Sequence, residues 1–339
     1  MPVIEGHTWR PEDVTLHLAP ARPRLVGRAE KEALIASGTS YGFLLERESE
    51  PSDVQEQAYA DSLARSGERL GIQLASLAAH LAASGQPVTL LSLPRGGLPV
   101  GAVLLRLLRR AGTDTEHHAI SVIRGVGLDL GALDTVLASR LVASLVFVDG
   151  WTGKGSVRAT LRSSLSGHPA QGTPLLVLSD PANVAELAAT REDQLLPHAA
   201  LNATVSGLLS RTFLVPGQTA HAALAWTHLA HLDRTPAYLD ALEAAALAAR
   251  PGPLAPRLSF GPLPEALRLA APYSGHDPHK IKPSVGEATR VFLRRIPSAL
   301  LVRDASDPEV AHLLALAAGE HVPVHVVPAL PYRALAVAR

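Results

Sequence analysis

The segment LVFVDGWTGKGSV, residues 145–157, joins an apolar run to side chains that could bind a phosphorylated sugar. Asp149 ends the apolar run, and a carboxylate at the end of a buried strand can reach ribose hydroxyls or a hydrated Mg²⁺. The loop that follows offers hydroxyl groups, an ammonium group and backbone N–H groups, from Thr152, Gly153, Lys154, Gly155 and Ser156. Glycines at the start of a helix favour anion binding, because they let the backbone approach a phosphate closely.

Two other interpretations of this segment can be compared with the phosphate site. An ordinary polar turn between a strand and a helix fits the spacing equally well. A Walker A loop does not fit, because the segment lacks the four-residue gap between glycines and has no Ser or Thr directly after Lys154.

A second glycine-rich loop strengthens the phosphate interpretation. The segment LLSLPRGGLPVG places Arg95, Gly96 and Gly97 after a predicted strand and ahead of a predicted helix. Two such loops on one sheet suit a ligand that carries phosphates at two ends. A phosphate at one loop, a ribose over Asp149 and a pyrophosphate at Arg95 together describe phosphoribosyl pyrophosphate.

Apolar runs that alternate with helical patterns must position these loops. Strands are predicted over residues 88–93, 118–124, 145–149 and 174–180, and helices over 102–112, 131–140 and 156–165. Further helices are predicted to start near Asp53 and to cover residues 69–83. The alternation predicts an α/β fold with a parallel sheet flanked by helices. Ligands of such sheets bind at the carboxyl ends of the strands, where both loops fall.

Composition limits the class of protein. The chain has 339 residues, 47% of them hydrophobic and 18% charged, which is typical of a globular protein of about two domains. Lys plus Arg (31) balances Asp plus Glu (31), so net charge gives no bulk attraction to nucleic acid. The sequence shows neither a signal peptide nor an apolar membrane span, so we expect a soluble, cytoplasmic protein without a membrane partner.

Shifts in composition predict four regions. We expect an N-terminal extension packing on the core over residues 1–55, the main α/β domain over 56–250, a linker rich in Pro and Gly over 251–275, and a small α/β domain over 276–339. The last region should contain a loop and helix at 281–295, a strand at 298–304, a helix at 307–321 and a strand at 322–328. A homo-oligomer is among the states that the sequence allows.

The two glycine loops resemble those of known enzymes. PRGGLPVG together with LVFVDGWTGKGS resembles the pyrophosphate and phosphoribosyl pyrophosphate loops of type I phosphoribosyltransferases. More narrowly, HHAISVIRGVGLD, FVDGWTGKG and LNATVSGLLSRT resemble the StiP-type family of bacterial tellurite-resistance and stress operons, over roughly residues 35–250. That family is sometimes labelled a cysteine protease. The chain has no cysteine, so it has no cysteine nucleophile, no disulfide and no thiolate metal site. It also shows no other nucleophile–base signature of a peptidase, and a pair of Ser156 with a distant histidine is the one alternative left for that activity.

The resemblance implies a type I phosphoribosyltransferase-like sheet and a transfer of ribose 5-phosphate to a base or related nucleophile, with release of pyrophosphate. Mg²⁺ would act as the cofactor together with phosphoribosyl pyrophosphate. The catalytic residues implied are Asp149, Arg95 and Lys154. The residues implied to bind the ligand are Arg95, Gly96, Gly97, Asp149, Thr152, Gly153, Lys154, Gly155 and Ser156.

Three further residues are candidates for the substrate side of such a site. Arg124 and Asp129 could belong to a hood over the ligand, or could form an ion pair at the end of a strand. Asp180 could face the acceptor, although a capping role ahead of Pro181 fits its position better. By the resemblance, residues 204–212 would shape the acceptor pocket.

The main loop departs from the enzyme pattern. Phosphoribosyltransferases place two adjacent acids before this loop, whereas Gly150 follows Asp149 here, Trp151 intrudes and the loop is one residue shorter. The alternative to an enzyme is therefore a catalytically inactive regulator that senses a nucleotide or RNA.

The C-terminal region resembles the Pelota type of RNA-binding domain, through IKPSVGEATRVFLRR and the segments after it. The resemblance implies that Glu287 accepts hydrogen bonds from guanine edges at an irregular RNA element. The phosphate-facing charges would come from Lys282, Arg290, Arg294 and Arg295. Ser284 stands where glycine is usual, and Gly286 where asparagine is common. Without the resemblance, a solvated amphipathic helix with a basic outer face explains the segment.

Overall fold

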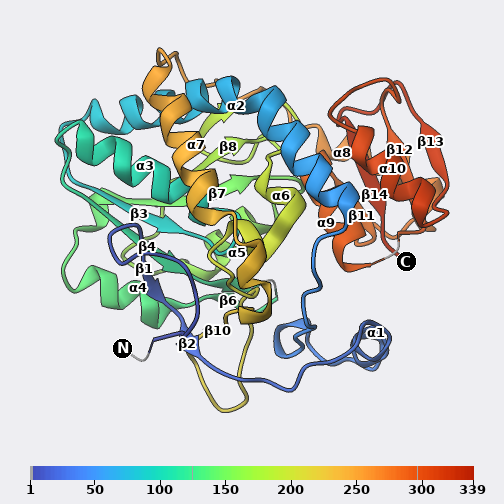
Figure 1. The fold of residues 1–339 in the computed structure, drawn as a ribbon, viewed down its shortest axis with the longest axis horizontal. Helices are drawn as coiled ribbons and strands as arrows, with labels where there is room; N and C mark the ends of the chain where they lie inside the picture. Colours follow the sequence, from blue (N-terminus) through green and yellow to red (C-terminus); the bar gives the residue numbers. More distant parts are fainter. Residues whose placement is uncertain (1–2, 124, 296) are drawn as a thin grey trace.

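A six-stranded parallel sheet forms the centre of the molecule (Figure 1). The computed structural model describes residues 3–123, 125–295 and 297–339. The strand order is β1-β4-β3-β7-β8-β9, and every neighbouring pair is parallel. The strands are β1 (Thr15–His17), β3 (Val88–Ser92), β4 (Thr115–Ile120), β7 (Leu145–Trp151), β8 (Leu175–Ser179) and β9 (Leu187–Thr190). The predicted α/β fold with a parallel sheet is confirmed.

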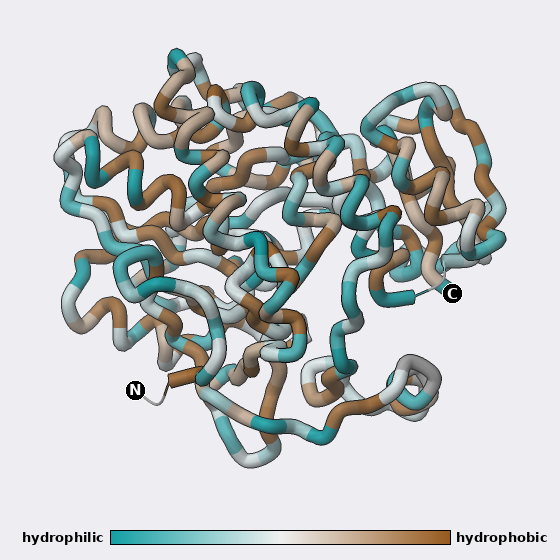
Figure 2. Tube along the Cα trace, in the orientation of Figure 1, coloured by the Kyte–Doolittle hydropathy of each residue, from teal (hydrophilic) through white to brown (hydrophobic). Residues whose placement is uncertain are grey.

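Helices cover both faces of this sheet, so the central strands β3, β7 and β8 are buried along their whole length. Successive residues of a strand face opposite sides, so Leu90 belongs to one apolar cluster and Leu91 to another. The first cluster includes side chains of α2 (Asp53–Ala82), α3 (Leu98–Arg110) and α7 (Thr235–Ala248), and the second includes side chains of α4 (Leu130–Leu137) and α5 (Ser156–Ser164). Figure 2 shows the apolar residues gathered along the central strands and the helices that face them.

Helix α2 differs from the two separate helices predicted for this region. It is one helix of 30 residues. A capping box fixes its start, where the backbone N–H of Ser52 donates to Gln55 Oε1 at 2.7 Å. Ser62 and Ser66 lie ahead of the second predicted helix, and both are buried within α2, where the small side chains allow close packing.

The N-terminal region contributes to the central sheet. Strand β1 pairs with β4 at its edge, and β2 (Ala19–Pro20) pairs with β10 (Ala222–Ala223). Beyond them lie α1 (Arg28–Ala36) and η1 (Tyr41–Phe43). The residues predicted as an extension that packs on the core therefore supply one strand of that core.

Short elements complete the main domain around the sheet. They are β5 (Val122–Ile123), β6 (Gly127–Leu128), η2 (Val142–Ser144), α6 (His198–Leu201), η3 (Asn202–Val205) and η4 (Thr227–Leu232). Strands β5 and β6 form an antiparallel pair. None of the helices in the described part of the chain is long and apolar enough to cross a membrane.

The C-terminal part folds around a second, four-stranded sheet with the order β11-β14-β12-β13 (Figure 1, right). Its strands are β11 (Ile281–Pro283), β12 (Ala299–Val302), β13 (Val324–Val326) and β14 (Ala334–Val337), and its helices are α8 (Leu263–Ser274), α9 (Val285–Arg294) and α10 (Ala311–Gly319). The predicted small α/β domain is therefore present, with mixed strand directions.

Helix α8 corrects the predicted linker of residues 251–275. Its side chains Ala266 and Ala270 are fully buried in one apolar cluster with Ile281 and Leu301 of the C-terminal sheet. The Pro-rich composition is misleading here because Pro264 lies in the first turn of the helix, where proline is tolerated. The C-terminal domain therefore begins at this helix.

The two parts of the molecule share one apolar core. Helix α9 packs on the segment that leads into α6, and Val291 and Phe292 belong to the same buried cluster as Leu196 and Ala199. Because this contact is apolar and buried, the C-terminal domain is docked on the main domain through a continuous core.

Candidate functional site

The order of the strands creates a crevice between β3 and β7. After β3 the chain proceeds to β4 on one side, and it later returns to β7 on the other side. The loops that leave two such strands diverge, and ligands of open parallel sheets bind in the crevice between them. The predicted loops 94–97 and 152–156 leave these two strands.

The loop after β3 is in direct contact with the end of β7 across this crevice. A Cβ atom on Gly96 would lie 2.5 Å from Asp149 Oδ1, and one on Gly97 would lie 2.1 Å from the carbonyl oxygen of Val148. The backbone N–H of Leu93 donates to that same carbonyl at 2.9 Å. A side chain at either position would therefore clash with the end of β7, and residues of both loops line one cavity at this edge of the sheet.

Asp149 lies at the bottom of the crevice, with 9% of its surface exposed. Its Oδ1 accepts a hydrogen bond of 2.8 Å from the N–H of Gly150. Burial raises the pKa of this carboxyl group to about 6; the Arg290 guanidinium and the Gly150 hydrogen bond oppose the rise, and the Glu287 carboxylate adds to it. The group can therefore change its protonation state near neutral pH.

The loop after Asp149 leads into a helix start that can bind an anion. Gly155 adopts a left-handed conformation (φ 79°) immediately before α5, and no side chain of the described residues caps this helix. The first N–H groups of an uncapped helix have no partner within it. Gly155, Ser156 and Val157 all line the cavity described below.

Arg95 and Lys154 line the same cavity but also hold parts of the chain together. Arg95 Nη1 donates to Glu48 Oε2 at 2.6 Å and to the carbonyl oxygen of Leu209 at 3.0 Å. Lys154 Nζ donates to the carbonyl oxygen of Pro278, just before β11. Both cations therefore connect this edge of the sheet to segments that are distant in sequence.

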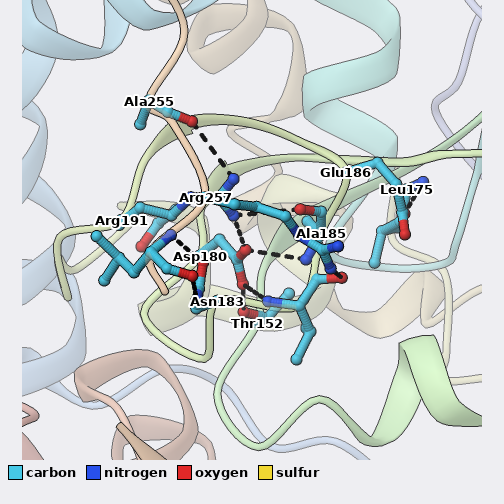
Figure 3. Close-up of polar contacts among 12 residues, drawn as sticks. Thr152, Leu175, Asp180, Asn183, Ala185, Glu186, Arg191, Ala255 and Arg257 are labelled. Atoms are coloured by element: carbon cyan, nitrogen blue, oxygen red, sulfur yellow. Dashed lines mark hydrogen bonds and ion pairs between the residues drawn. The ribbon is translucent and has the colours of Figure 1, made fainter. Parts of the chain in front are cut away.

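Asp180 lies beneath the loop instead of facing the cavity. Its side chain is fully buried, and its two oxygens accept hydrogen bonds from Thr152 Oγ1, the N–H groups of Val184 and Ala185, and Arg191 Nη1 (Figure 3). Such a carboxylate has no free oxygen to offer a substrate. Asp180 therefore has a structural role: it binds the backbone N–H groups that follow it, much as the predicted capping residue would.

Asp129 is also a capping residue. Its Oδ1 accepts from the N–H of Ala132 at 3.0 Å at the start of α4, and its Oδ2 accepts from the N–H of His221 at 2.8 Å. The structure therefore does not place Asp129 at the cavity on the substrate side. Its predicted partner, Arg124, lies outside the described residues.

The predicted RNA-facing residues border the same cavity as the phosphate loops. The cavity has a volume of about 580 Å³. From the C-terminal domain it is lined by Lys282, Pro283, Glu287, Arg290, Val291, Arg294 and Arg295. Sequence reasoning treated the two sets as separate sites, whereas the fold unites them between the two domains.

Close packing explains the residues that depart from the family patterns. A Cβ atom on Gly286 would lie 2.6 Å from the ring of Trp151, so a larger residue there would displace the tryptophan. The Arg290 guanidinium lies 4.2 Å from the centroid of that ring, within cation–π distance. A Cβ atom on Gly153 would lie 2.5 Å from Glu287 Cγ. The unusual Trp151 is thus matched by the unusual Gly286.

Buried hydrogen bonds fix the C-terminal domain in this position. Asp193 accepts from the N–H groups of Val285 and Arg333, each at 2.9 Å, and burial raises the pKa of Asp193 to about 7 against those hydrogen bonds. Tyr332 donates its hydroxyl hydrogen to the carbonyl oxygen of Gly153 at 3.0 Å. Ser284, which replaces the usual glycine, has a φ of 90° and its Oγ accepts from the N–H of Glu287 at 3.2 Å.

The cavity is strongly basic, although the chain as a whole is neutral. Its described lining includes two acidic side chains, Asp149 and Glu287, and nine basic ones: Lys31, Arg95, Lys154, Arg158, Arg211, Lys282, Arg290, Arg294 and Arg295. Three of the nine, Lys31, Arg95 and Arg158, are paired with glutamates that do not line this cavity. Basic side chains outnumber acidic ones in this lining, which favours an anionic ligand.

The basic side chains around the cavity affect the pKa of Tyr41. Burial acts to raise the pKa of its phenol, but the nearby cations Arg294, Arg211, Lys31 and Arg295 outweigh burial and bring the pKa below the ordinary value. The Arg211 guanidinium lies 4.0 Å from the centroid of the tyrosine ring. Arg211 falls in the predicted acceptor segment 204–212, whereas nothing in the sequence pointed to Lys31 or Tyr41.

Comparisons with known proteins identify both parts of the chain. Residues 7–243 match the family model described as "Tellurite-like stress resistance cysteine protease StiP", and residues 262–339 match the "PELOTA RNA binding domain". A relative from Acinetobacter baylyi, named "Cysteine protease StiP", is 33% identical over 97% of this chain and 92% of its own length. Because the chain contains no cysteine, that part of the name cannot describe a nucleophile here.

Solved structures with partial similarity include two purine phosphoribosyltransferases. The hypoxanthine-guanine phosphoribosyltransferase of Bacillus anthracis is 14% identical, with a TM-score of 0.26 over 37% of this chain and 77% of that chain. The hypoxanthine phosphoribosyltransferase of Trypanosoma cruzi is 12% identical, with a TM-score of 0.29 over 52% of this chain and 97% of that chain. These scores are too low to carry a conclusion about ligands.

Proposed function

This chain is a member of the StiP family with a C-terminal PELOTA RNA-binding domain, and we propose that its cavity binds phosphoribosyl pyrophosphate and transfers ribose 5-phosphate to a base or related nucleophile. The reaction would release pyrophosphate and serve a tellurite or related stress response, coupled to RNA binding by the PELOTA domain.

One observation carries this proposal. Two glycine-rich loops meet around Asp149 at the switch point of a parallel sheet, inside a basic cavity of about 580 Å³. A cavity of this volume is in the usual range for a small ligand. Its excess of cations suits a sugar with phosphates at both ends, and Asp149 stands between the loops where a ribose would lie.

Different groups of the site would bind the 5-phosphate and the departing pyrophosphate. The N–H groups at the start of α5 would hold the 5-phosphate as a handle that fixes the sugar. The bond between ribose C1 and the pyrophosphate oxygen would break with its electron pair leaving on pyrophosphate, while the acceptor forms the new bond to C1 and releases its proton to solvent. Arg95 would stabilise the negative charge that grows on pyrophosphate, once it exchanges part of its contact with Glu48 for the ligand.

Mg²⁺ fits this arrangement through the ligand. Within the described residues no group of three or more His, Asp or Glu side chains could hold a metal ion by itself. Mg²⁺ is usually held by one or two carboxylates together with phosphate oxygens. Asp149 and Glu287 are the carboxylates of the described cavity lining that could fill this role. When bound, the ion would neutralise charge on pyrophosphate.

Calorimetry with the full chain tests the proposal. Phosphoribosyl pyrophosphate with Mg²⁺ should bind saturably to the wild type, and Asp149→Ala should abolish the binding. Asp304→Ala is a matched control, because Asp304 is exposed in a turn of the C-terminal domain and should leave the binding unchanged. Absence of binding to the wild type would rule the proposal out.

A regulator without turnover is the second candidate, and one observation favours it. A Cβ atom on Gly150 would lie 2.8 Å from His198 Nε2 and 3.0 Å from the carbonyl oxygen of Gly96, so the loop has no room for a second acid at this position. Binding of phosphoribosyl pyrophosphate without release of pyrophosphate, over a panel of nucleobase acceptors, would support a sensor. Release of pyrophosphate that depends on an acceptor would support the enzyme.

A further inference from the structure

The PELOTA domain presents Glu287 and Arg290 to the cavity of the main domain. Resting on the proposed function, we propose that these two residues contact the phosphorylated sugar itself, so that this ligand and RNA compete for one cavity. The domain would then act as a wall of the ligand site in addition to binding RNA.

Arg290 is positioned to bind an anion. A Cβ atom on Gly96 would lie 3.2 Å from Arg290 Nη2, which places this guanidinium over the loop between β3 and α3. The ring of Trp151 packs against the flat face of the Arg290 guanidinium. The Nε atom of Arg290 is buried without a hydrogen-bond partner among the described residues. The ion pair with Glu287 is long, at 3.6 Å. The guanidinium is therefore held in place with unused donors, which suits bidentate binding of a phosphate.

Glu287 supplies the acid that the loop after β7 lacks. Position 150 is closed to any side chain, as described above, yet Glu287 lies against Gly153 in the same loop. It is also close enough to Asp149 to raise the pKa of that carboxyl group. About a third of the Glu287 side chain is exposed (32%), so its carboxylate can still meet a ligand or a ligand-bound cation. The two domains together thus provide two carboxylates.

The PELOTA domain is too firmly docked for this face to be free. Buried Glu309 accepts from the N–H of Leu195 at 2.7 Å and from Arg69 Nη2 at 2.9 Å, both in the main domain. Tyr332 and Asp193 add further hydrogen bonds between the two domains. An RNA that uses Glu287 and Arg290 must therefore enter the cavity that the sugar phosphate occupies.

The first part of the test measures ligand affinity by calorimetry in wild type and variants. Arg290→Ala and Glu287→Gln should each weaken phosphoribosyl pyrophosphate with Mg²⁺ by about 10- to 100-fold, the usual range for a lost charge-assisted hydrogen bond. Arg290→Lys, which keeps the charge, should recover part of the loss. Arg268→Ala and Glu265→Gln are the controls, since they form an exposed pair on α8 of the same domain. Melting temperatures verify that every variant is folded.

The second part uses a fluorescein-labelled hairpin RNA with a purine-rich internal loop. Phosphoribosyl pyrophosphate with Mg²⁺ should displace it from the wild type, with a midpoint that follows the ligand affinity of each variant.

Each contrary result has its own meaning. If the wild type does not bind the sugar phosphate, the proposed function fails and this inference fails with it. If the wild type binds but Arg290→Ala and Glu287→Gln bind equally well, only this inference is overturned. RNA that does not bind, or that binds with the same affinity at saturating sugar phosphate, overturns the competition.

Discussion

Asp149 and Asp180 occupy similar places near the carboxyl ends of adjacent strands, and both precede polar loops, yet their surroundings differ completely. The oxygens of Asp180 accept four hydrogen bonds from its own domain. The Asp149 side chain accepts a hydrogen bond from the backbone N–H of its neighbour Gly150, and it faces a cavity whose opposite wall comes from another domain. A carboxylate whose oxygens already accept several hydrogen bonds has a structural role, whereas one with few such bonds can contact a ligand.

The two aspartates are also connected. Thr152 donates its hydroxyl hydrogen to Asp180 from the loop that begins two residues after Gly150. Asp180 thereby fixes the conformation of the loop that Asp149 needs. Mutating Asp180 should affect folding and mutating Asp149 should affect ligand binding, so the two effects can be separated.

The largest effect is expected for Asp180→Ala. It removes the partner of the buried Arg191 guanidinium and leaves the N–H groups of Val184 and Ala185 without an acceptor. Breaking a buried ion pair on one side typically costs about 3–5 kcal/mol in the free energy of unfolding. Urea unfolding should show this loss for Asp180→Ala and a much smaller change for Asp149→Ala. Equal losses would contradict the distinction between the two carboxylates.

A smaller effect, on binding alone, is expected for Asp149→Asn. The amide keeps the shape of the side chain but removes the charge that meets the ribose side of the ligand. The affinity for phosphoribosyl pyrophosphate with Mg²⁺ should fall by about 100-fold, since a hydrogen bond to a charged group contributes about 1.5–3 kcal/mol. Calorimetry measures the loss. An unchanged affinity would mean that Asp149, like Asp180, serves only the structure.

The dependence of Asp149 on the second domain is tested by Gly153→Ala. The new methyl group would meet Glu287 Cγ and the carbonyl oxygen of Pro283, both at 2.5 Å, and push the domains apart. Overpacking of this kind typically costs about 1–3 kcal/mol. Gly67→Ala is the control, because nothing lies within 4 Å of a Cβ there and the residue is inside α2, where alanine is favoured by about 1 kcal/mol. Thermal unfolding should move in opposite directions for the two variants.

The smallest effect is the pH dependence of binding. Burial raises the pKa of Asp149 to about 6 from an ordinary value of 3.8, so the folded protein carries the neutral acid below about pH 6. A ligand that needs the carboxylate should therefore bind about tenfold more tightly at pH 7 than at pH 5, because the ionised fraction of Asp149 rises from roughly a tenth to roughly nine tenths. The dependence should be lost in Asp149→Asn. If it persists unchanged, titration of another group, or of the ligand, is responsible.

The same rise in pKa has a consequence for stability. Between about pH 4 and pH 6 the unfolded chain has ionised Asp149 while the folded chain keeps it protonated, so the contribution of this residue to the free energy of unfolding falls as the pH rises. Asp193, with a pKa of about 7, has a contribution of the same sign that extends to higher pH. Comparison of Asp149→Asn with the wild type separates the two.

The main sheet and both loops could be predicted from the sequence because they depend on local signals. Apolar runs bounded by glycine define β3 and β7, and the loops follow directly from them. The edge strands β1 and β9 could not be predicted, since they are short and owe their conformation to pairing with longer neighbours. Helix α8 was hidden by the prolines at its ends.

The wall of the cavity could not be predicted, because it depends on docking between distant segments. Glu287 and Arg290 are residues of the types expected in an RNA site, and nothing in their own segment indicates that the main domain packs against them. The pairing of Trp151 with Gly286 was visible only as two separate departures from family patterns, and its meaning came from the ring and the glycine being in contact.

The docking of α9 on the loops after β3 and β7 also sets an order of assembly. Ribosomes make β3 and β7 before α9, so the segments that carry Gly96 and Asp149 emerge from the exit tunnel before the helix that carries Glu287 and Arg290. A nascent or truncated chain that stops ahead of β11 would keep its sheet but leave Asp149 uncovered. Full competence for the ligand would therefore require synthesis at least through α9.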